Sequence, residues 1–126
     1  MTVTEVQEIE RLLGLALPRH YVEMVVNYPS ALLGTEAEDF GLLNTPEAVV
    51  EQNTEVRNGP FYGAKWPDRY LVIGENGCGD LYVTKLDATE FSVGFFDHEQ
   101  RAFVPHSSTK EEFVAKLLHE QGDASA

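Results

Sequence analysis

Four strand-like runs follow one another closely between residues 69 and 105, and no other feature constrains the fold as much. RYLVIG, DLYVTKL and FSVGFFDH are rich in β-branched and aromatic residues, and RAFVP adds a short fourth run that ends at Pro105. Consecutive strands joined by short turns run antiparallel. With FGLLN (40–44) as a further short strand, the sequence predicts a mostly antiparallel sheet of four to six strands.

Helical patterns flank these strands on both sides. Apolar residues recur at helical spacing in residues 4–14 and again in residues 18–28. A Thr-Pro pair predicts the start of a third helix over residues 46–58. Ser108 and Glu111 have capping-box spacing ahead of a C-terminal amphipathic helix. Helices before and after an antiparallel sheet indicate an α+β fold.

The length of 126 residues, 43% of them hydrophobic, suits one domain. We expect that domain over residues 1–119 and a flexible tail over residues 120–126. No apolar run approaches the length that crosses a bilayer, and the N-terminus lacks the basic region of a signal peptide. The single cysteine excludes an internal disulfide and a multi-cysteine zinc site. These features predict a cytoplasmic protein.

The excess of acidic residues indicates which classes of molecule the protein can bind. Acidic residues outnumber basic ones by 21 to 9, which gives a formal net charge of −12. Nucleic acids and anionic membranes require clustered lysine and arginine, so we expect neither as a partner. An acidic surface favours fast encounter with a basic protein, although the same charge also serves solubility alone.

The stretch IGENGCGDLYVTKL (73–86) has the pattern of a hairpin between two strands. Asn76-Gly77 is a strong hairpin signal, because both residues tolerate positive φ. Cys78-Gly79 could form a bulge, and Asp80 could accept hydrogen bonds from the amides of the turn. Backbone geometry alone therefore accounts for the stretch.

An enzyme is the alternative interpretation of the same stretch. A nucleophilic Cys78 would need a base such as His98, oriented by Asp97, but nothing in the spacing requires that arrangement. The sequence Asp97-His98-Glu99 offers metal-ligand types, yet neighbours on a strand point to opposite faces. The glycines match neither a P-loop nor a dinucleotide fingerprint. We therefore expect no catalysis, no metal and no cofactor.

Three segments carry a resemblance to a known family. The first is LPRHY (17–21), the second is IGENGCGDLY (73–82), and the third is residues 93–99, which end in Asp-His-Glu ahead of a helix introduced by serines. In this order they resemble the SUKH superfamily, also called the Smi/Knr-type domain. The residues that match the family motifs are Pro18, Tyr21, Gly74, Gly77, Gly79, Asp80 and Tyr82.

The resemblance implies an α+β domain without catalytic activity. Bacterial relatives are similar to immunity proteins, which bind and neutralise toxin domains, often nucleases. Fungal relatives resemble regulatory hubs, so a regulatory or scaffold module that binds a housekeeping protein is the alternative function. Because nucleases are often basic, the acidic charge fits the first role.

Exposed acids and aromatics near the sheet and its loops are the candidate contacts for a protein partner. Taken singly, each acid is more typical of a solvated surface charge, and Trp66 could equally pack in the core. The candidates are Glu36, Glu38 and Asp39 in the connector, Trp66 and Asp68 in an aromatic loop, Glu75 at the hairpin, and Asp97 and Glu99 after the third long strand.

Overall fold

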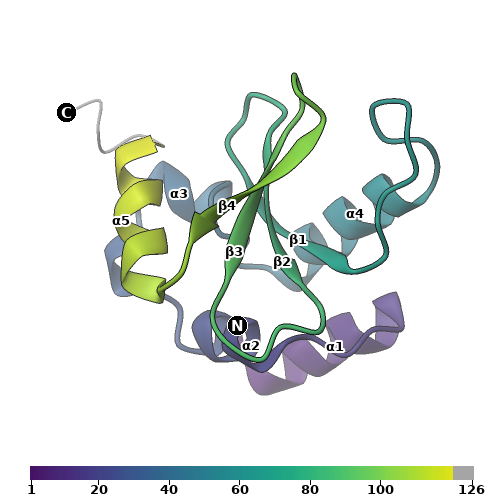
Figure 1. The fold of residues 1–126 in the computed structure, drawn as a ribbon. Helices are drawn as coiled ribbons and strands as arrows, with labels where there is room; N and C mark the ends of the chain where they lie inside the picture. Colours follow the sequence, from purple (N-terminus) through teal and green to yellow (C-terminus); the bar gives the residue numbers. More distant parts are fainter. Residues whose placement is uncertain (121–126) are drawn as a thin grey trace.

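A four-stranded antiparallel sheet forms the centre of the computed structural model, which describes residues 1–120 (Figure 1). Its strands, neighbours in sequence order, are β1 (Tyr70–Glu75), β2 (Leu81–Lys85), β3 (Val93–Asp97) and β4 (Ala102–Ser107). The helices are α1 (Val3–Leu13), α2 (Arg19–Val26), α3 (Glu36–Asp39), α4 (Pro46–Arg57) and α5 (Lys110–Glu120), with a 3-10 turn, η1 (Ser30–Leu32), ahead of α3. The predicted α+β fold is confirmed.

Two hydrophobic cores of different size lie on the two faces of the sheet. The larger core packs one face of the sheet against the helices and includes Ile9, Tyr21, Leu42, Leu71 and Phe113. The smaller core contains Val56, Trp66, Val72, Leu81, Val83 and Phe96. Figure 1 shows α4 beside β1 and α5 beside β4, so helices lie at both edges of the sheet.

Hydroxyl caps set the starts of α4 and α5. The predicted start of α4 is confirmed, because the Thr45 hydroxyl accepts a hydrogen bond from the Ala48 N–H. The predicted start of α5 is one residue early. The Thr109 hydroxyl accepts from the Glu112 N–H at 3.1 Å, while the Glu112 carboxylate accepts from the Ser108 N–H at 2.7 Å. Thr109 and Glu112 together thus satisfy two free amides.

Residues 40–44 form a turn after α3, so the predicted short strand is wrong. The Phe40 N–H completes the last turn of α3, which keeps the backbone from extending. The segment nevertheless lies against β1. The Glu75 N–H donates to the Phe40 carbonyl at 2.7 Å, and the Leu43 N–H donates to the Ile73 carbonyl at 2.9 Å.

Side chains bind further backbone groups on this outer side of β1, which we call the β1 edge. Asn53 on α4 accepts from the Val72 N–H at 2.8 Å and donates to the Val72 carbonyl at 2.9 Å, as a neighbouring strand would. The Trp66 indole N–H donates to the Tyr70 carbonyl at 2.9 Å. The edge is therefore closed to pairing with another chain.

A bulge lies in β1, where the pairing with β2 shifts between Val72 and Gly74. The predicted bulge at residues 78–79 is wrong. Gly74 lies so close to the turn after α3 that a Cβ there would overlap the Gly41 carbonyl. The irregularity thus falls where β1 meets that turn, and this contact requires glycine.

The last helix continues to Glu120, which the sequence had placed in the tail. The rest of the predicted tail, residues 121–126, lies outside the described residues. Within the described part of the chain, none of the helices combines the length and apolar character needed to cross a bilayer.

Candidate functional site

The loop between β1 and β2 (76–80) is organised by the side chain of Asn76. Its carbonyl oxygen accepts from the Cys78 N–H at 2.9 Å and the Asp80 N–H at 3.3 Å. Gly77 and Gly79 supply the two positive φ angles, 80° and 98°. The hairpin is confirmed, but Asn76 performs the role predicted for Asp80 because it lies at the start of the turn, where its oxygen reaches the following amides.

Asp80 instead connects this loop to the end of β3. Its Oδ1 accepts from the His98 backbone N–H at 3.0 Å and lies 2.6 Å from His98 Nδ1, and its Oδ2 accepts from the Asn76 amide at 2.9 Å. Burial alone would raise the pKa of Asp80, but these hydrogen bonds outweigh burial and lower that pKa. The ionised carboxylate thus holds the hairpin to β3.

The hydrogen bonds of His98 do not support a cysteine nucleophile. Cys78 is exposed at the loop tip, and no hydrogen bond within residues 1–120 joins its thiol to His98. Asp80, Asp97 and His98 have ligand-type atoms within 4.8 Å of one another, whereas Glu99 does not belong to this group. Because Asp80 Oδ1 and His98 Nδ1 already bind each other, the geometry is that of a structural hydrogen-bonded pair.

The other motif residues also have structural roles. Pro18 precedes α2 with extended backbone, and Tyr21 on that helix is fully buried, which raises the pKa of its phenol. Tyr82 is fully buried against Phe113, and its hydroxyl donates to Glu120 at 2.7 Å. The family motifs therefore build the fold, and the contact residues must be sought elsewhere.

The candidate contacts in the connector differ in what their side chains do. Glu36 is exposed on α3. The Glu38 carboxylate accepts from the Gly34 N–H at 3.0 Å and the Asn44 amide at 3.1 Å, which ties α3 to its neighbouring turns. The side chain of Asp39 lies outside the described residues.

In the aromatic loop, Trp66 packs inward. Its side chain is 3% exposed and contacts the rings of Phe61, Phe96 and Phe103. Asp68 is exposed, with its carboxylate 3.9 Å from the Lys65 ammonium. This geometry matches the core-packing alternative for Trp66 and leaves Asp68 accessible to a partner.

Glu75 and Asp97 come to the same end of the sheet, because Leu81 pairs with Glu75 on one side and with Phe96 on the other. Both carboxylates accept internal hydrogen bonds, Glu75 from Gln52 and Asp97 from backbone amides of the following turn. Glu99 in that turn is exposed. Of the candidate acids, the structure thus brings Glu75 and Asp97 to one end of the sheet, with Glu99 in the adjoining turn.

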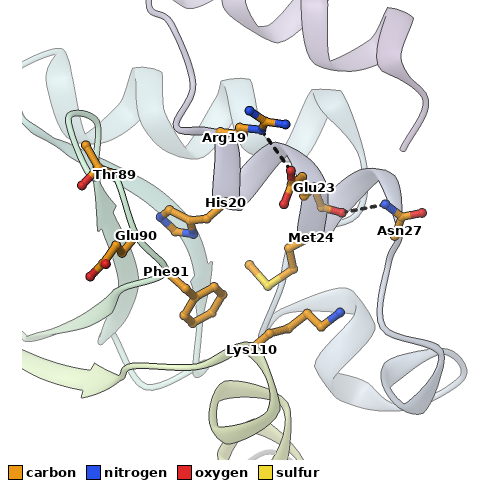
Figure 2. Close-up of a pocket in the computed structure, with 9 residues that line it drawn as sticks. All are labelled: Arg19, His20, Glu23, Met24, Asn27, Thr89, Glu90, Phe91 and Lys110. Carbon is orange, nitrogen blue, oxygen red and sulfur yellow. Dashed lines mark hydrogen bonds and ion pairs between the residues drawn. The ribbon is translucent and has the colours of Figure 1, made fainter.

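A cleft of about 740 Å³ opens between α2, the β2–β3 loop and the start of α5 (Figure 2), and we call it the α2–α5 cleft. Figure 2 shows Met24 and Phe91 facing each other between His20 and Lys110. Both signs of charge line this cleft. Its lining residues are Arg19, His20, Glu23, Met24, Asn27, Thr89, Glu90, Phe91 and Lys110.

The hydrogen bonds of His20 determine its tautomer. The Thr84 hydroxyl donates to the Ser92 carbonyl at 2.8 Å, so it must accept from His20 Nε2 at 2.9 Å. Nδ1 then carries the lone pair, and this buried nitrogen has no hydrogen-bond partner within residues 1–120. Burial lowers the pKa of His20, against the opposing effect of Glu23.

A second hollow, the α1–α4 groove, measures about 640 Å³ and carries a different charge pattern. Leu12, Pro46 and Val50 supply its apolar surface. Its charged rim is wholly acidic and consists of Glu8, Glu47, Glu51 and Glu55. None of these glutamates is among the contacts predicted from the sequence, although three of them recur at every fourth residue within a predicted helix, which is a visible signal.

Comparison with known proteins relates most of the chain to one family. The family model described as SMI1 / KNR4 family (SUKH-1) matches residues 1–116. No curated protein and no solved structure matches the chain. The family match includes all three segments in which the resemblance was seen and every element of the fold except the last turn of α5.

Proposed function

The chain belongs to the SMI1/KNR4 family (SUKH-1), and from this membership we propose that it is a protein-binding domain with no chemistry of its own. We propose further that it is an immunity protein, which neutralises a nuclease-type toxin by binding it. The family match over residues 1–116 is the observation that carries this proposal. In this role the protein acts in the cytoplasm, where an incoming nuclease meets its substrate.

The charge of the chain supports a basic partner. A nuclease surface must attract phosphates, so it presents lysine and arginine. An inhibitor with a net charge of −12 would accelerate its encounter with such a surface through electrostatic steering. The exposed carboxylates of Glu36, Asp68 and Glu99 are candidate contacts for this steering.

The arrangement at the hairpin supports a binding role over catalysis. A nucleophile and its base must lie within hydrogen-bond reach. Here the His98 imidazole is bound to Asp80, and Cys78 is an exposed thiol at the tip of the turn. The Asp80–His98 pair therefore acts as part of the fold.

The test is capture of the partner followed by co-expression. The tagged full chain is incubated with host lysate at low and at moderate salt, and retained proteins are identified by mass spectrometry. The captured protein is then produced in cells with and without this chain. We expect a basic toxin that arrests growth alone, is tolerated when co-expressed, and binds more weakly as salt rises.

Three outcomes would overturn parts of the proposal. A captured toxin whose growth arrest persists despite co-expression would contradict the immunity role. Recovery of a housekeeping protein alone would favour the regulatory or scaffold module. If a neutralised toxin bound equally well at both salt concentrations, the immunity role would stand and electrostatic steering would be contradicted.

A further inference from the structure

We propose that the α1–α4 groove is the docking site for a basic amphipathic helix of the partner protein. The helix inserts an apolar side chain beside Leu12 and Val50 and places its lysines or arginines against Glu47, Glu51 and Glu55, which we call the acidic ridge. The proposal rests on the proposed function only for the claim that the natural helix belongs to a toxin.

The apolar part of the groove is accessible. Leu12 is 53% exposed, whereas Val6 and Ile9 on the same helix are buried, and Val50 is half-buried beside it. Scattered apolar residues are common on protein surfaces, but these residues line one hollow together with Pro46. The groove therefore offers a site in which an apolar anchor would lose contact with water.

Within residues 1–120, no cationic side chain pairs with the acidic ridge, although Glu47 lies in the first turn of α4, where the helix dipole favours a negative charge. The three glutamates of the ridge are exposed and lie one helical turn apart, so neighbouring carboxylates repel each other. In the part of the chain that the structure describes, none of the three forms a salt bridge, whereas Glu8 on the opposite wall is paired with Arg11. Lysine or arginine side chains of a partner would replace this repulsion with attraction.

The geometry and charge of the walls favour a helix from another protein. Both walls are helices whose backbone groups are bound internally, so an extended peptide would find no main-chain partners, whereas a helix satisfies its own. The ridge repeats about every 6 Å along α4, which matches cations four residues apart on a second helix. A second copy of this acidic chain would add like charges, and the ridge would repel nucleic acid.

The probe is a fluorescein-labelled 14-residue peptide that presents leucines on one helical face and lysines at i and i+4 beside them. A peptide of identical composition in scrambled order is the matched ligand control. Fluorescence anisotropy measures binding to the full chain at low and at physiological salt. We expect the helical peptide to bind in a salt-dependent manner and the scrambled peptide to bind at least fivefold more weakly.

Two matched protein variants locate the site. The ridge variant is Glu47→Gln/Glu51→Gln/Glu55→Gln, and the control is Asp87→Asn/Glu90→Gln/Glu111→Gln, which removes the same charge from the β2–β3 loop and α5. We expect about tenfold weaker binding by the ridge variant, because three exposed ion pairs are lost, and less than a twofold change in the control. Leu12→Ser should weaken binding about fivefold at every salt concentration.

Equal losses in the two triple variants would overturn the proposal, since net charge would then explain binding. A larger loss in the control would place the peptide near the β2–β3 loop or α5 and overturn the proposal. Absence of binding up to about 1 mM peptide would also overturn it. If the wild type and the ridge variant neutralised a toxin equally well, the proposed function would stand and the groove would not be the docking site. If the peptide bound at the groove but the chain neutralised no toxin, the docking site would stand and the proposed function would fall.

Discussion

The β1 edge and the α1–α4 groove lie on two sides of the same helix, α4. They differ in whether their polar groups have hydrogen-bond or ion-pair partners within the protein. At the β1 edge, both polar ends of the Asn53 amide are bound to the backbone of Val72 and the side chain is buried. At the groove, the acidic ridge has three exposed carboxylates, and none of them forms a salt bridge within residues 1–120.

This difference separates residues that maintain the fold from residues available to a partner. An unpaired backbone amide in the interior costs free energy, so its partner cannot be removed without loss of stability. An exposed carboxylate remains hydrated, so its removal leaves stability nearly unchanged and alters only what the surface attracts. Substitutions at the edge should therefore affect unfolding, and substitutions at the groove should affect binding.

The largest expected effect comes from Gly74→Ala, which breaks the contact between the β1 edge and the turn after α3. The new methyl group would overlap the Gly41 carbonyl, and neither backbone can yield without loss of the Glu75–Phe40 hydrogen bond. We expect the free energy of unfolding to fall by about 3 kcal/mol, measured by urea denaturation. Gly77→Ala is the control, since its Cβ meets open space and only the positive φ costs about 1 kcal/mol. Equal losses would contradict the close-contact explanation.

Asn53→Leu should produce the next largest effect at the same edge. The substitution keeps a similar side-chain volume but leaves the buried N–H and carbonyl of Val72 without partners. We expect a loss of about 2 kcal/mol in the free energy of unfolding. Hydrogen exchange locates the effect, because the Val72 amide should lose protection relative to Leu71 and Ile73. Unchanged protection at Val72 would contradict the role assigned to Asn53.

Sequence periodicity predicted the sheet and the main helices because their apolar faces repeat over many residues. Periodicity predicted the wrong structure where a single hydrogen bond determines the local backbone conformation. FGLLN has strand-like composition, yet the end of α3 turns it, and the Thr109 cap displaces the start of α5 by one residue. Asn53 was visible between Val49 and Val56 on the apolar side of a predicted helix, a position that indicates a buried polar contact.

The candidate surfaces were harder to predict than the fold. The acidic residues chosen from the sequence include Glu38 and Asp97, whose carboxylates bind neighbouring backbone groups. No local pattern distinguishes such an acid from a free one. The α1–α4 groove depends on how two helices separated by more than thirty residues pack together, so only the tertiary structure places Leu12 beside the acidic ridge.

A smaller effect of opposite sign is expected on the groove side. Glu51→Gln/Glu55→Gln removes the repulsion between carboxylates one turn apart but keeps Glu47 near the positive N-terminus of α4. We expect the free energy of unfolding to rise by about 0.5 kcal/mol at low salt, measured by thermal and urea unfolding. The gain should shrink as salt screens the repulsion. A loss of stability would show that these carboxylates make internal contacts, and the contrast between the two sides of α4 would fail.

The smallest effect concerns His20, whose imidazole has one nitrogen with an internal hydrogen-bond partner and one nitrogen without. Nε2 donates to Thr84, while the buried Nδ1 has no partner within residues 1–120, and burial lowers the pKa of the ring below its unfolded value. The unfolded chain therefore takes up the proton first as pH falls. The contribution of His20 to stability is complete above its unfolded pKa, near 6.5, and is lost as pH falls through the lower folded pKa.

Urea unfolding at pH 7.5, 6.5 and 5.5 tests this linkage. His20→Gln, which retains an N–H donor for Thr84, should lose less stability between pH 7.5 and 5.5 than the wild type. His119→Gln, on the exposed side of α5, is the control for general removal of a histidine. If the wild type and His20→Gln lost equal stability, the unpartnered nitrogen would have a source of stabilisation in its charged form, such as the Glu23 carboxylate. The contrast between polar atoms with and without internal partners would then not apply to Nδ1, because the side chains of the α2–α5 cleft would rearrange to bind the protonated ring.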